Sequence, residues 1–266
     1  MSNYPPPMSQ VILKTPAQLD LMRRAGQLLA QVFTELDSFI RPGVTTMQIN
    51  DLAEAFIVDS LKARPASKGQ YNYPYCINTS INEVVCHGMP STVDVLKEGD
   101  IVNFDITLEK NGFIADSSKT YTVGQVTPVA QKLVDACYMA MWKGIQTVRP
   151  GATLGDVGFA ISQYARKNGY SVVRDYCGHG IGREMHEAPE VLHWGTPRTG
   201  LRLKEGMVFT IEPMLNQGGH AVQTGKDGWT VRTCDGLLSA QFEHTVAVTE
   251  SGVRVLTLRP DETIPH

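Results

Sequence analysis

The sequence predicts an α+β protein made of two half-domains built on one plan, and three observations lead to that prediction. The first is a hairpin signal between Leu96 and Asp116, where two alternating apolar runs flank an Asn-Gly dipeptide. The second is a partial repeat of this segment further along the chain, and the third is a helix-break-helix pattern before each copy. Matched segments in the same order, at nearly constant spacing, indicate a duplication.

The hairpin has a register that follows from counting residues. Alternating apolar residues on both sides of Asn-Gly are the strongest short-range signal for two antiparallel strands joined by a type I′ turn. With residues 111 and 112 at the centre of the turn, the facing pairs are Lys110 with Phe113, Thr107 with Asp116, and Asp105 with Ser118. Asp105 and Asp116 then lie on one face as diagonal neighbours, with Cα atoms roughly 7–8 Å apart.

Two adjacent carboxylates on a packed face are unfavourable. They repel each other, and burying them costs hydration free energy. A cation between them offsets both costs. A solvated hairpin face is the alternative for this pair taken alone, because one face of an antiparallel sheet is often exposed to water.

The repeat places acids at equivalent points of two segments. Residues 96–105 read LKEGDIVNFD and residues 203–212 read LKEGMVFTIE, so Asp105 and Glu212 are equivalent. A further strand with an acid follows each LKEG strand, and the acids are Asp116 and Glu243. A His-Gly dipeptide, beginning at His87 or His179, precedes each LKEG strand. If the copies face one another across a pseudo-twofold axis, four carboxylates and two imidazoles meet at the centre.

The remaining elements follow the same repeated order. Residues 1–11, with three consecutive prolines, are expected to form a short flexible arm. Helical spacing predicts helices over residues 16–41 and 46–62, and another pair around residues 149–151. In each copy an Arg-Pro-Gly segment ends one helix, and the threonine two residues later can begin the next. No linker divides the copies, so residues 12–266 are predicted to form one domain.

Composition narrows the function classes. Charged residues make up 19% of the 266 residues and the net charge is −3, which argues against binding to nucleic acid or to a membrane surface. No apolar run has the length of a membrane span, and the first ten residues lack the features of a secretory signal. Five cysteines without a C-x-x-C spacing argue against a disulfide framework or structural zinc. A cytoplasmic protein is predicted.

The repeated acids and one histidine match the ligands of two divalent cations. The set carries up to four negative charges and one imidazole nitrogen, which suits Mn²⁺, Fe²⁺, Co²⁺ or Zn²⁺. Two such ions about 3.5–4 Å apart can lower the pKa of a shared water towards about 7, so hydrolysis of a carbonyl substrate is the natural use. The predicted ligands are Asp105, Asp116, His179, Glu212 and Glu243.

Two further histidines are predicted to act on a substrate. His87 and His186 are not needed to complete the ligand set, so they can donate hydrogen bonds to a substrate or to a developing oxyanion. The alternative for each is a surface or packed histidine. The other histidines are predicted to be structural, and His244 should face away from Glu243 because neighbours on a strand point to opposite faces. They are His193, His220, His244 and His266.

With these residues in hand, the chain resembles the type I methionine aminopeptidases, which have the pita-bread metallopeptidase fold. The resemblance extends from about residue 12 to residue 258. The motifs that carry it, besides the two hairpin aspartates, are SINEVVCHG at 80–88, GHGIG at 178–182, TIEP at 210–213 and QFEHT at 241–245. The resemblance implies two half-domains related by a pseudo-twofold axis, with an antiparallel sheet at the core and helices outside.

The resemblance also implies how the metal ligands work. Asp116 and Glu243 would bridge two metal ions. Asp105 would bind one ion, and His179 and Glu212 would bind the other. A hydroxide bridging the ions would attack the carbonyl of the first residue, with Glu212 relaying protons.

Substrate contacts are implied in the same way. His186 would steady the tetrahedral intermediate, and His87 would contact the scissile amide. Tyr73 and Trp229 match the pocket that holds the methionine side chain in the family. The substrates would be N-termini of nascent polypeptides with a small second residue. The family resemblance implies a monomer and leaves contact with the ribosome open.

The chain departs from the family at three positions of the methionine pocket. Asn78 stands where the family usually has cysteine, Met185 where it has an aromatic residue, and Gln70 near where it often has tyrosine. Because the metal ligands are untouched, we expect the same reaction with an altered tolerance for the first side chain.

Two alternatives share parts of this pattern. An Xaa-Pro aminopeptidase or prolidase has the same fold and ligands, but usually carries a sizeable N-terminal domain that does not fit before Ile12. A non-catalytic binding module of this fold would have lost acids and gained a basic surface. Here every acid is present and the net charge is negative.

Overall fold

The computed structural model describes residues 10–265, so His266 and most of the expected arm at residues 1–11 lie outside the described residues. The last residue of that arm contacts the fold. Val11 is half buried and packs against one of the hydrophobic cores. None of the described helices is long and apolar enough to cross a membrane.

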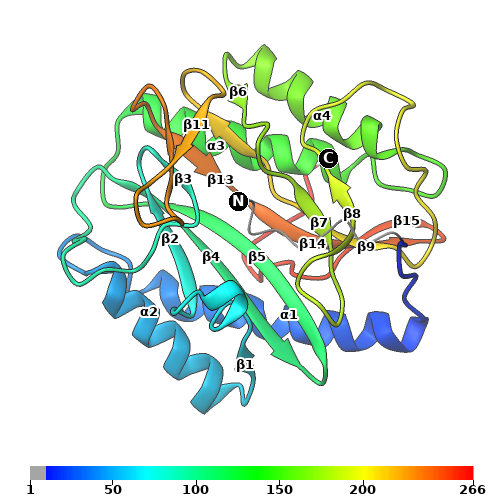
Figure 1. Ribbon diagram of the computed structural model, residues 1–266, viewed down its shortest axis with the longest axis horizontal. Coiled ribbons are helices and arrows are strands. Elements are labelled where there is room, and N and C mark those ends of the chain that lie inside the picture. The colour runs from blue at the N-terminus through cyan, green and yellow to red at the C-terminus, as the bar shows by residue number, and fades with distance from the viewer. Residues whose placement is uncertain (1–9, 266) are drawn as a thin grey trace.

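Within residues 10–265, nine strands form an antiparallel sheet through the centre of the molecule (Figure 1). Its order is β1-β4-β5-β14-β9-β7-β8, with β2 paired to β4 and β15 paired to β14. The bounds are β1 Arg64–Pro65, β2 Ile77–Ile81, β4 Ile101–Lys110, β5 Phe113–Thr122, β7 Gly178–Gly180, β8 Glu187–Val191, β9 Val208–Ile211, β14 Glu243–Thr249 and β15 Gly252–Val255.

Shorter strands form two small sheets within the described residues. One has the order β13-β10-β6 and the other β11-β12-β3. Their strands are β3 Val84–Cys86, β6 Ser171–Val172, β10 Met214–Asn216, β11 Val222–Thr224, β12 Val231–Thr233 and β13 Ser239–Gln241. Most of these strands come from the segment between β9 and β14, so that segment adds structure to the second half of the chain.

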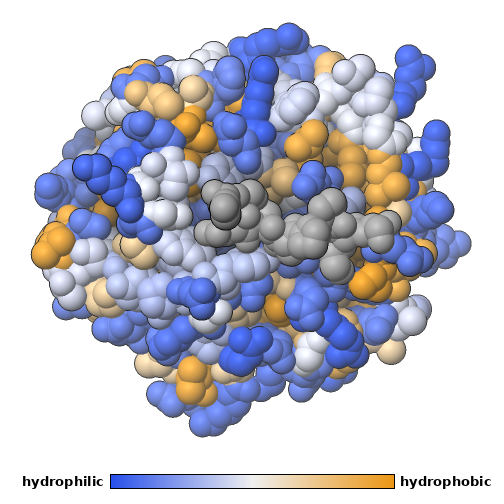
Figure 2. All heavy atoms as spheres, in the orientation of Figure 1, coloured by the Kyte–Doolittle hydropathy of each residue, from blue (hydrophilic) through white to orange (hydrophobic). Residues whose placement is uncertain are grey.

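Helices flank the sheet in two pairs, α1 Pro16–Asp37 with α2 Thr46–Ala55, and α3 Pro128–Ile145 with α4 Leu154–Lys167. In the view of Figure 1 the first pair lies below the central strands and the second pair above them. Each pair packs on its own hydrophobic core, one including Phe104 of β4 and the other Phe209 of β9. On the face shown in Figure 2, hydrophilic side chains surround smaller groups of apolar ones.

The structure confirms the duplicated plan. Outward from the contact between β5 and β14, the strands read β5-β4-β2 on one side and β14-β9-β7 on the other. Thr45 and Thr153 each begin a helix with a reciprocal capping box. Each also forms an isolated bridge to a segment that precedes a central strand, Thr45 with Val95 before β4 and Thr153 with Arg202 before β9. The two halves therefore share the order of their central strands and the capping residue of their second helix.

The hairpin register is also confirmed. Asp105 lies opposite Ser118, and Thr107 opposite Asp116. The turn residues 111 and 112 have φ angles of 54° and 75°, and a type I′ turn requires positive φ at both positions.

The prediction that two strands begin at the LKEG segments is wrong. In both copies LKEG forms a turn, and the strands begin later, at Ile101 and Val208. Gly99 and Gly206 have φ angles of 93° and 85°, which glycine adopts without strain, and these turns direct the chain into the sheet. The helix expected over residues 16–41 ends at Asp37, because the chain turns before Pro42.

The expected equivalence of His87 and His179 is wrong as well. His179 lies on β7, which pairs with β9, and the strand in the equivalent place beside β4 is β2. His87 instead follows β3, outside the central sheet. Matching two His-Gly dipeptides in the sequence could not show this, because equivalence depends on which strands pair.

Candidate metal centre

A cavity of about 500 Å³ opens beside the middle of the sheet. Its walls come from both halves of the chain and from the small sheets. Every predicted site residue lines it, namely Gln70, Tyr73, Asn78, His87, Asp105, Asp116, His179, Met185, His186, Glu212, Trp229 and Glu243. The structure therefore brings together residues that are far apart in the sequence.

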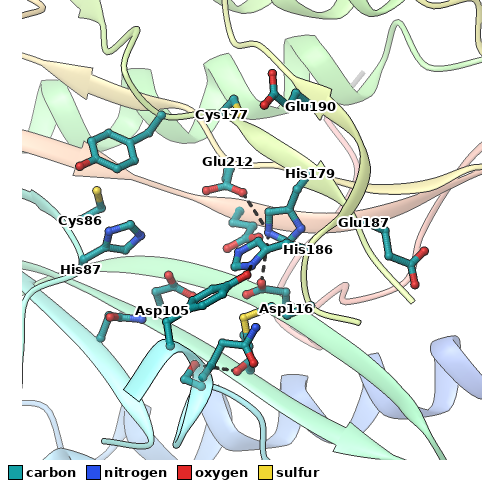
Figure 3. Close-up of a pocket in the computed structure, with 18 of the residues that line it drawn as sticks. Cys86, His87, Asp105, Asp116, Cys177, His179, His186, Glu187, Glu190 and Glu212 are labelled. Atoms are coloured by element: carbon teal, nitrogen blue, oxygen red, sulfur yellow. Dashed lines mark hydrogen bonds and ion pairs between the residues drawn. The ribbon is translucent and has the colours of Figure 1, made fainter. Parts of the chain in front are cut away.

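Neighbouring strands carry the acids. Asp105 lies on β4, Asp116 on β5 and Glu243 on β14, and Glu212 directly follows β9. Figure 3 shows the side chains of Asp105, Asp116 and Glu212 converging with that of His179. The duplicated sheet thus supplies two acids from each half to one point.

His179 presents a ring nitrogen to two of these acids. Its Nδ1 lies 3.0 Å from the Gly180 carbonyl oxygen, which can only accept a hydrogen bond, so Nδ1 carries a proton. Its Nε2 lies 3.6 Å from Asp116 Oδ2 and 3.6 Å from Glu212 Oε1 (Figure 3). In the neutral ring this places a lone pair against two carboxylates, which is unfavourable unless a proton or a metal ion lies between them. Burial opposes a charge on the ring, but Asp116 and Glu212 outweigh it and raise the pKa of His179.

Several carboxylate oxygens are buried without a partner. Asp105 Oδ1, Asp116 Oδ1 and Glu243 Oε1 accept no hydrogen bond from the described residues. Burial, and then the charge of Asp116, raise the pKa values of Asp105 and Glu243 well above the ordinary carboxyl range. Burial also raises the pKa of Glu212 to about 7. Oxygen-rich, unpartnered anionic sites of this kind fit divalent cations.

The geometry fits a metal ion in a second respect. Ligand atoms of Asp116, His179 and Glu243 all lie within 4.8 Å of one another. The hydrogen bond from Nδ1 to Gly180 orients the His179 ring, as is usual for histidines that bind metals.

Polar groups that the sequence analysis did not single out hold the acids in place. Glu212 Oε1 accepts a hydrogen bond from Thr210 Oγ1 at 2.8 Å, and Oε2 accepts one from Gln241 Nε2 at 3.3 Å. The Glu212 backbone N–H donates to His193 Nε2 at 3.1 Å. Thr245 Oγ1 donates to the carbonyl of Asp116 at 2.7 Å. The Glu212 carboxylate is therefore positioned by a hydroxyl and an amide side chain, and Asp116 is held through its backbone.

The rest of the cavity wall is aromatic and histidine-rich. The Tyr73 and Trp229 rings meet edge to face with centroids 4.9 Å apart, and the His186 ring lies 4.4 Å from that of His179. Burial lowers the pKa of His87 to about 4 and, together with nearby histidines, that of His186 to about 2. Both rings are therefore neutral near pH 7, and each can donate one N–H.

The histidines predicted to be structural occupy other places. His244 is fully buried and faces away from the cavity, as expected from strand alternation. His193 is fully buried behind Glu212, and His220 is exposed. Two side chains of the site that carry no sequence signal are Tyr71, which bonds His186, and Glu187, which pairs with buried Lys14.

The chain is similar to known proteins over nearly its full length. The sequence profile of metallopeptidase family M24 matches residues 20–250. Methionine aminopeptidase of Salmonella typhimurium is 48% identical over 255 residues, covering 96% of this chain and 97% of that protein. The crystal structure of methionine aminopeptidase from Rickettsia prowazekii has a TM-score of 0.92 at 49% identity, covering 94% of this chain and 100% of the other. An Xaa-Pro dipeptidase from Bacillus anthracis is more distant, at 25% identity and a TM-score of 0.75, covering 95% of this chain and 63% of the other.

Proposed function

This chain belongs to metallopeptidase family M24, and on that premise we propose that it is a methionine aminopeptidase, which hydrolyses the peptide bond after an N-terminal methionine. Relatives that share about half of its residues carry that name. The substrates we propose are the N-termini of nascent polypeptides with a small second residue. The enzyme would act on them as a monomer in the cytoplasm, in transient contact with the ribosome.

One observation carries the proposal. Buried carboxylates from both halves of the fold surround His179 Nε2, and three of their oxygens have no partner among the described residues. They lie in a cavity whose volume, about 500 Å³, is in the range of small-molecule sites. This combination supports a metal-dependent hydrolase, and the name of its relatives supports action on the N-terminal end of a chain.

The ligands of two divalent cations would be the five predicted residues. Asp116 and Glu243 would hold the ions from the centre of the sheet, where β5 and β14 are neighbours. Asp105, His179 and Glu212 would complete the set of ligands. Bound Mn²⁺, Fe²⁺, Co²⁺ or Zn²⁺ would acidify water and polarise the substrate carbonyl.

The chain's own groups then bind the substrate and handle its protons. His186 and His87 are both neutral. His186 offers an N–H to the carbonyl oxygen of the bond that breaks, and His87 presents a ring nitrogen that can accept from the amide N–H of that bond. Glu212 can hold a proton on its carboxylate, oriented by Thr210 and Gln241, and pass it to the leaving amine. Tyr73 and Trp229 supply apolar surface for the methionine side chain.

The proposal is tested by removing the metal and restoring it. The protein is treated with a chelator, each candidate cation is added back, and methionine release from Met-Ala-Ser is measured. We expect activity to disappear and to return with at least one cation. Folded protein that releases no methionine with any of them would refute the proposal.

The same assay separates the rival activity. Ala-Pro-Ala is the matched substrate for an Xaa-Pro peptidase, and we expect it to be cleaved far more slowly than Met-Ala-Ser. Preferential cleavage of Ala-Pro-Ala would instead assign the Xaa-Pro reaction.

The methionine pocket can be tested separately. Gln70, Asn78 and Met185 line the cavity, and we propose that they alter its tolerance for the first side chain. A panel of Xaa-Ala-Ser peptides measures this. A profile identical to that of the Salmonella typhimurium enzyme would contradict it.

A further inference from the structure

Tyr71 makes a hydrogen bond to His186 inside the cavity. Its hydroxyl oxygen lies 3.1 Å from His186 Nδ1, and the two rings are nearly parallel, with an interplanar angle of 19° and centroids 5.7 Å apart. Both side chains line the cavity, where Figure 3 shows His186 beside His179. With Nδ1 bonded to Tyr71, Nε2 is the ring nitrogen that can serve a substrate.

The backbone around Tyr71 is unusual. Tyr71 has φ 49° and ψ 30°, and Asn72 has φ 68°, so two successive residues with side chains are left-handed. They lie in a tight turn at Gln70–Asn72, which follows Gly69 at φ 89°. Left-handed backbone is unfavourable for most residues with a Cβ atom, asparagine least of all, and such residues cluster in turns and at functional sites. The turn places the Tyr71 ring against His186.

The direction of this hydrogen bond decides what His186 can do. A neutral imidazole carries its proton on one nitrogen only. If Tyr71 donates to Nδ1, the proton is on Nε2, and Nε2–H can donate to a carbonyl oxygen or an oxyanion. The opposite tautomer would turn a lone pair towards the substrate oxygen. Burial raises the pKa of Tyr71, so its hydroxyl keeps the proton that it donates.

We propose that Tyr71 is a positioning residue that fixes His186 as the Nε2–H tautomer, so that His186 donates a hydrogen bond to the reacting carbonyl. The inference rests on the proposed aminopeptidase activity and adds to it a residue outside the predicted site. Tyr71 itself acts only through His186.

Removing one hydroxyl tests the proposal. In Tyr71→Phe the ring remains, and we expect kcat for Met-Ala-Ser to fall about tenfold while KM changes less than about twofold, because the His186 Nε2–H that Tyr71 holds in place acts on charge that develops after binding. Tyr75→Phe is the matched control, since Tyr75 is close in sequence but is not among the described residues that line the cavity. Kinetics of Tyr71→Phe identical to wild type would overturn the inference. A wild-type protein that releases no methionine would overturn the proposed function instead.

A double-mutant cycle shows whether Tyr71 acts through His186. In the His186→Ala background, Tyr71→Phe should change kcat by less than about twofold, because coupled residues are non-additive. Losses that multiply would assign Tyr71 a separate effect and contradict the inference.

The tautomer itself can be observed. Long-range ¹H–¹⁵N spectra of ¹⁵N-histidine-labelled protein distinguish protonated from unprotonated ring nitrogens. We expect a protonated Nε2 for His186 in the wild type and a mixture of tautomers in Tyr71→Phe. A protonated Nδ1 in the wild type, or the same spectrum in both proteins, would refute the assignment.

Discussion

Two neighbouring residues of β14 point to opposite faces of the sheet, and each enters a cluster of buried charge. Glu243 faces the cavity, where its Oε1 has no partner among the described residues. His244 faces the other way, and its Nε2 lies 3.2 Å from Glu262 Oε2. There Arg259 Nη2 donates to Glu262 Oε1 at 2.6 Å, and both side chains are buried.

The difference between the faces is the presence of protein cations. Burial opposes ionisation of Glu262, but His244 and Arg259 outweigh it and lower the pKa of Glu262 to about 2. On the cavity side the pKa values of Asp105 and Glu243 are raised, first by burial and then by neighbouring acids. No lysine or arginine is among the described residues that line the cavity. Balanced charge stabilises the fold, whereas unbalanced charge at similar depth indicates a site for a cation.

Breaking the balanced cluster should have the largest effect on stability. Glu262→Gln leaves Arg259 buried without an acid, and we expect the free energy of unfolding to fall by about 4 kcal/mol. Urea unfolding measures the change, with Glu35→Gln, at an exposed position of α1, as the control. A loss no larger than that of the control would show that the cluster is not a buried ion pair in solution.

The two faces should respond to pH in opposite directions. In metal-free protein the folded pKa of Glu212 is raised from 4.5 to about 7, so its contribution is complete below about pH 4.5 and is lost as pH rises through about 7. For Glu262, with its pKa lowered to about 2, the contribution is present above about pH 4.5 and is lost as pH falls through about 2.

Each of these two groups accounts for about 3 kcal/mol. We therefore expect the free energy of unfolding of the wild type, measured with chelator present and relative to that of Glu212→Gln, to fall by about 3 kcal/mol between about pH 4.5 and about pH 7. A difference between the two proteins that stays constant or rises over this range would contradict the assignment.

Removing one unbalanced acid should have a smaller effect, of opposite sign. Asp105→Asn takes away a buried carboxyl group whose ionisation the site opposes, so we expect the metal-free protein to gain about 1 kcal/mol at neutral pH. The same change should abolish methionine release. A variant that loses stability without metal would contradict the comparison between the two faces.

Local signals in the sequence predict much of this arrangement. The Asn-Gly turn fixes the hairpin register, because strand pairing across a two-residue turn depends only on residues close in the chain. Thr45 and Thr153 cap their helices by contacts three residues away. The repeat of acids then predicts that both halves meet, and the order of the central strands confirms it.

Other features depend on contacts between distant segments, so the sequence alone could not supply them. The counterpart of β7 is β2, and only the pairing of the sheet shows that His87 is not the equivalent of His179. Tyr71 reaches His186 through a left-handed turn that no motif marks. Gln241 reaches Glu212 only because the strands of the small sheet fold back beside the cavity.

Calorimetric titration of the chelator-stripped protein with Mn²⁺ tests most directly whether acids from both halves together hold metal ions. We predict binding of two ions per chain, and loss of binding when one acid from each half is replaced in the Asp116→Asn, Glu243→Gln variant. Absence of binding to the stripped wild type, or unchanged binding to the double variant, would contradict the account.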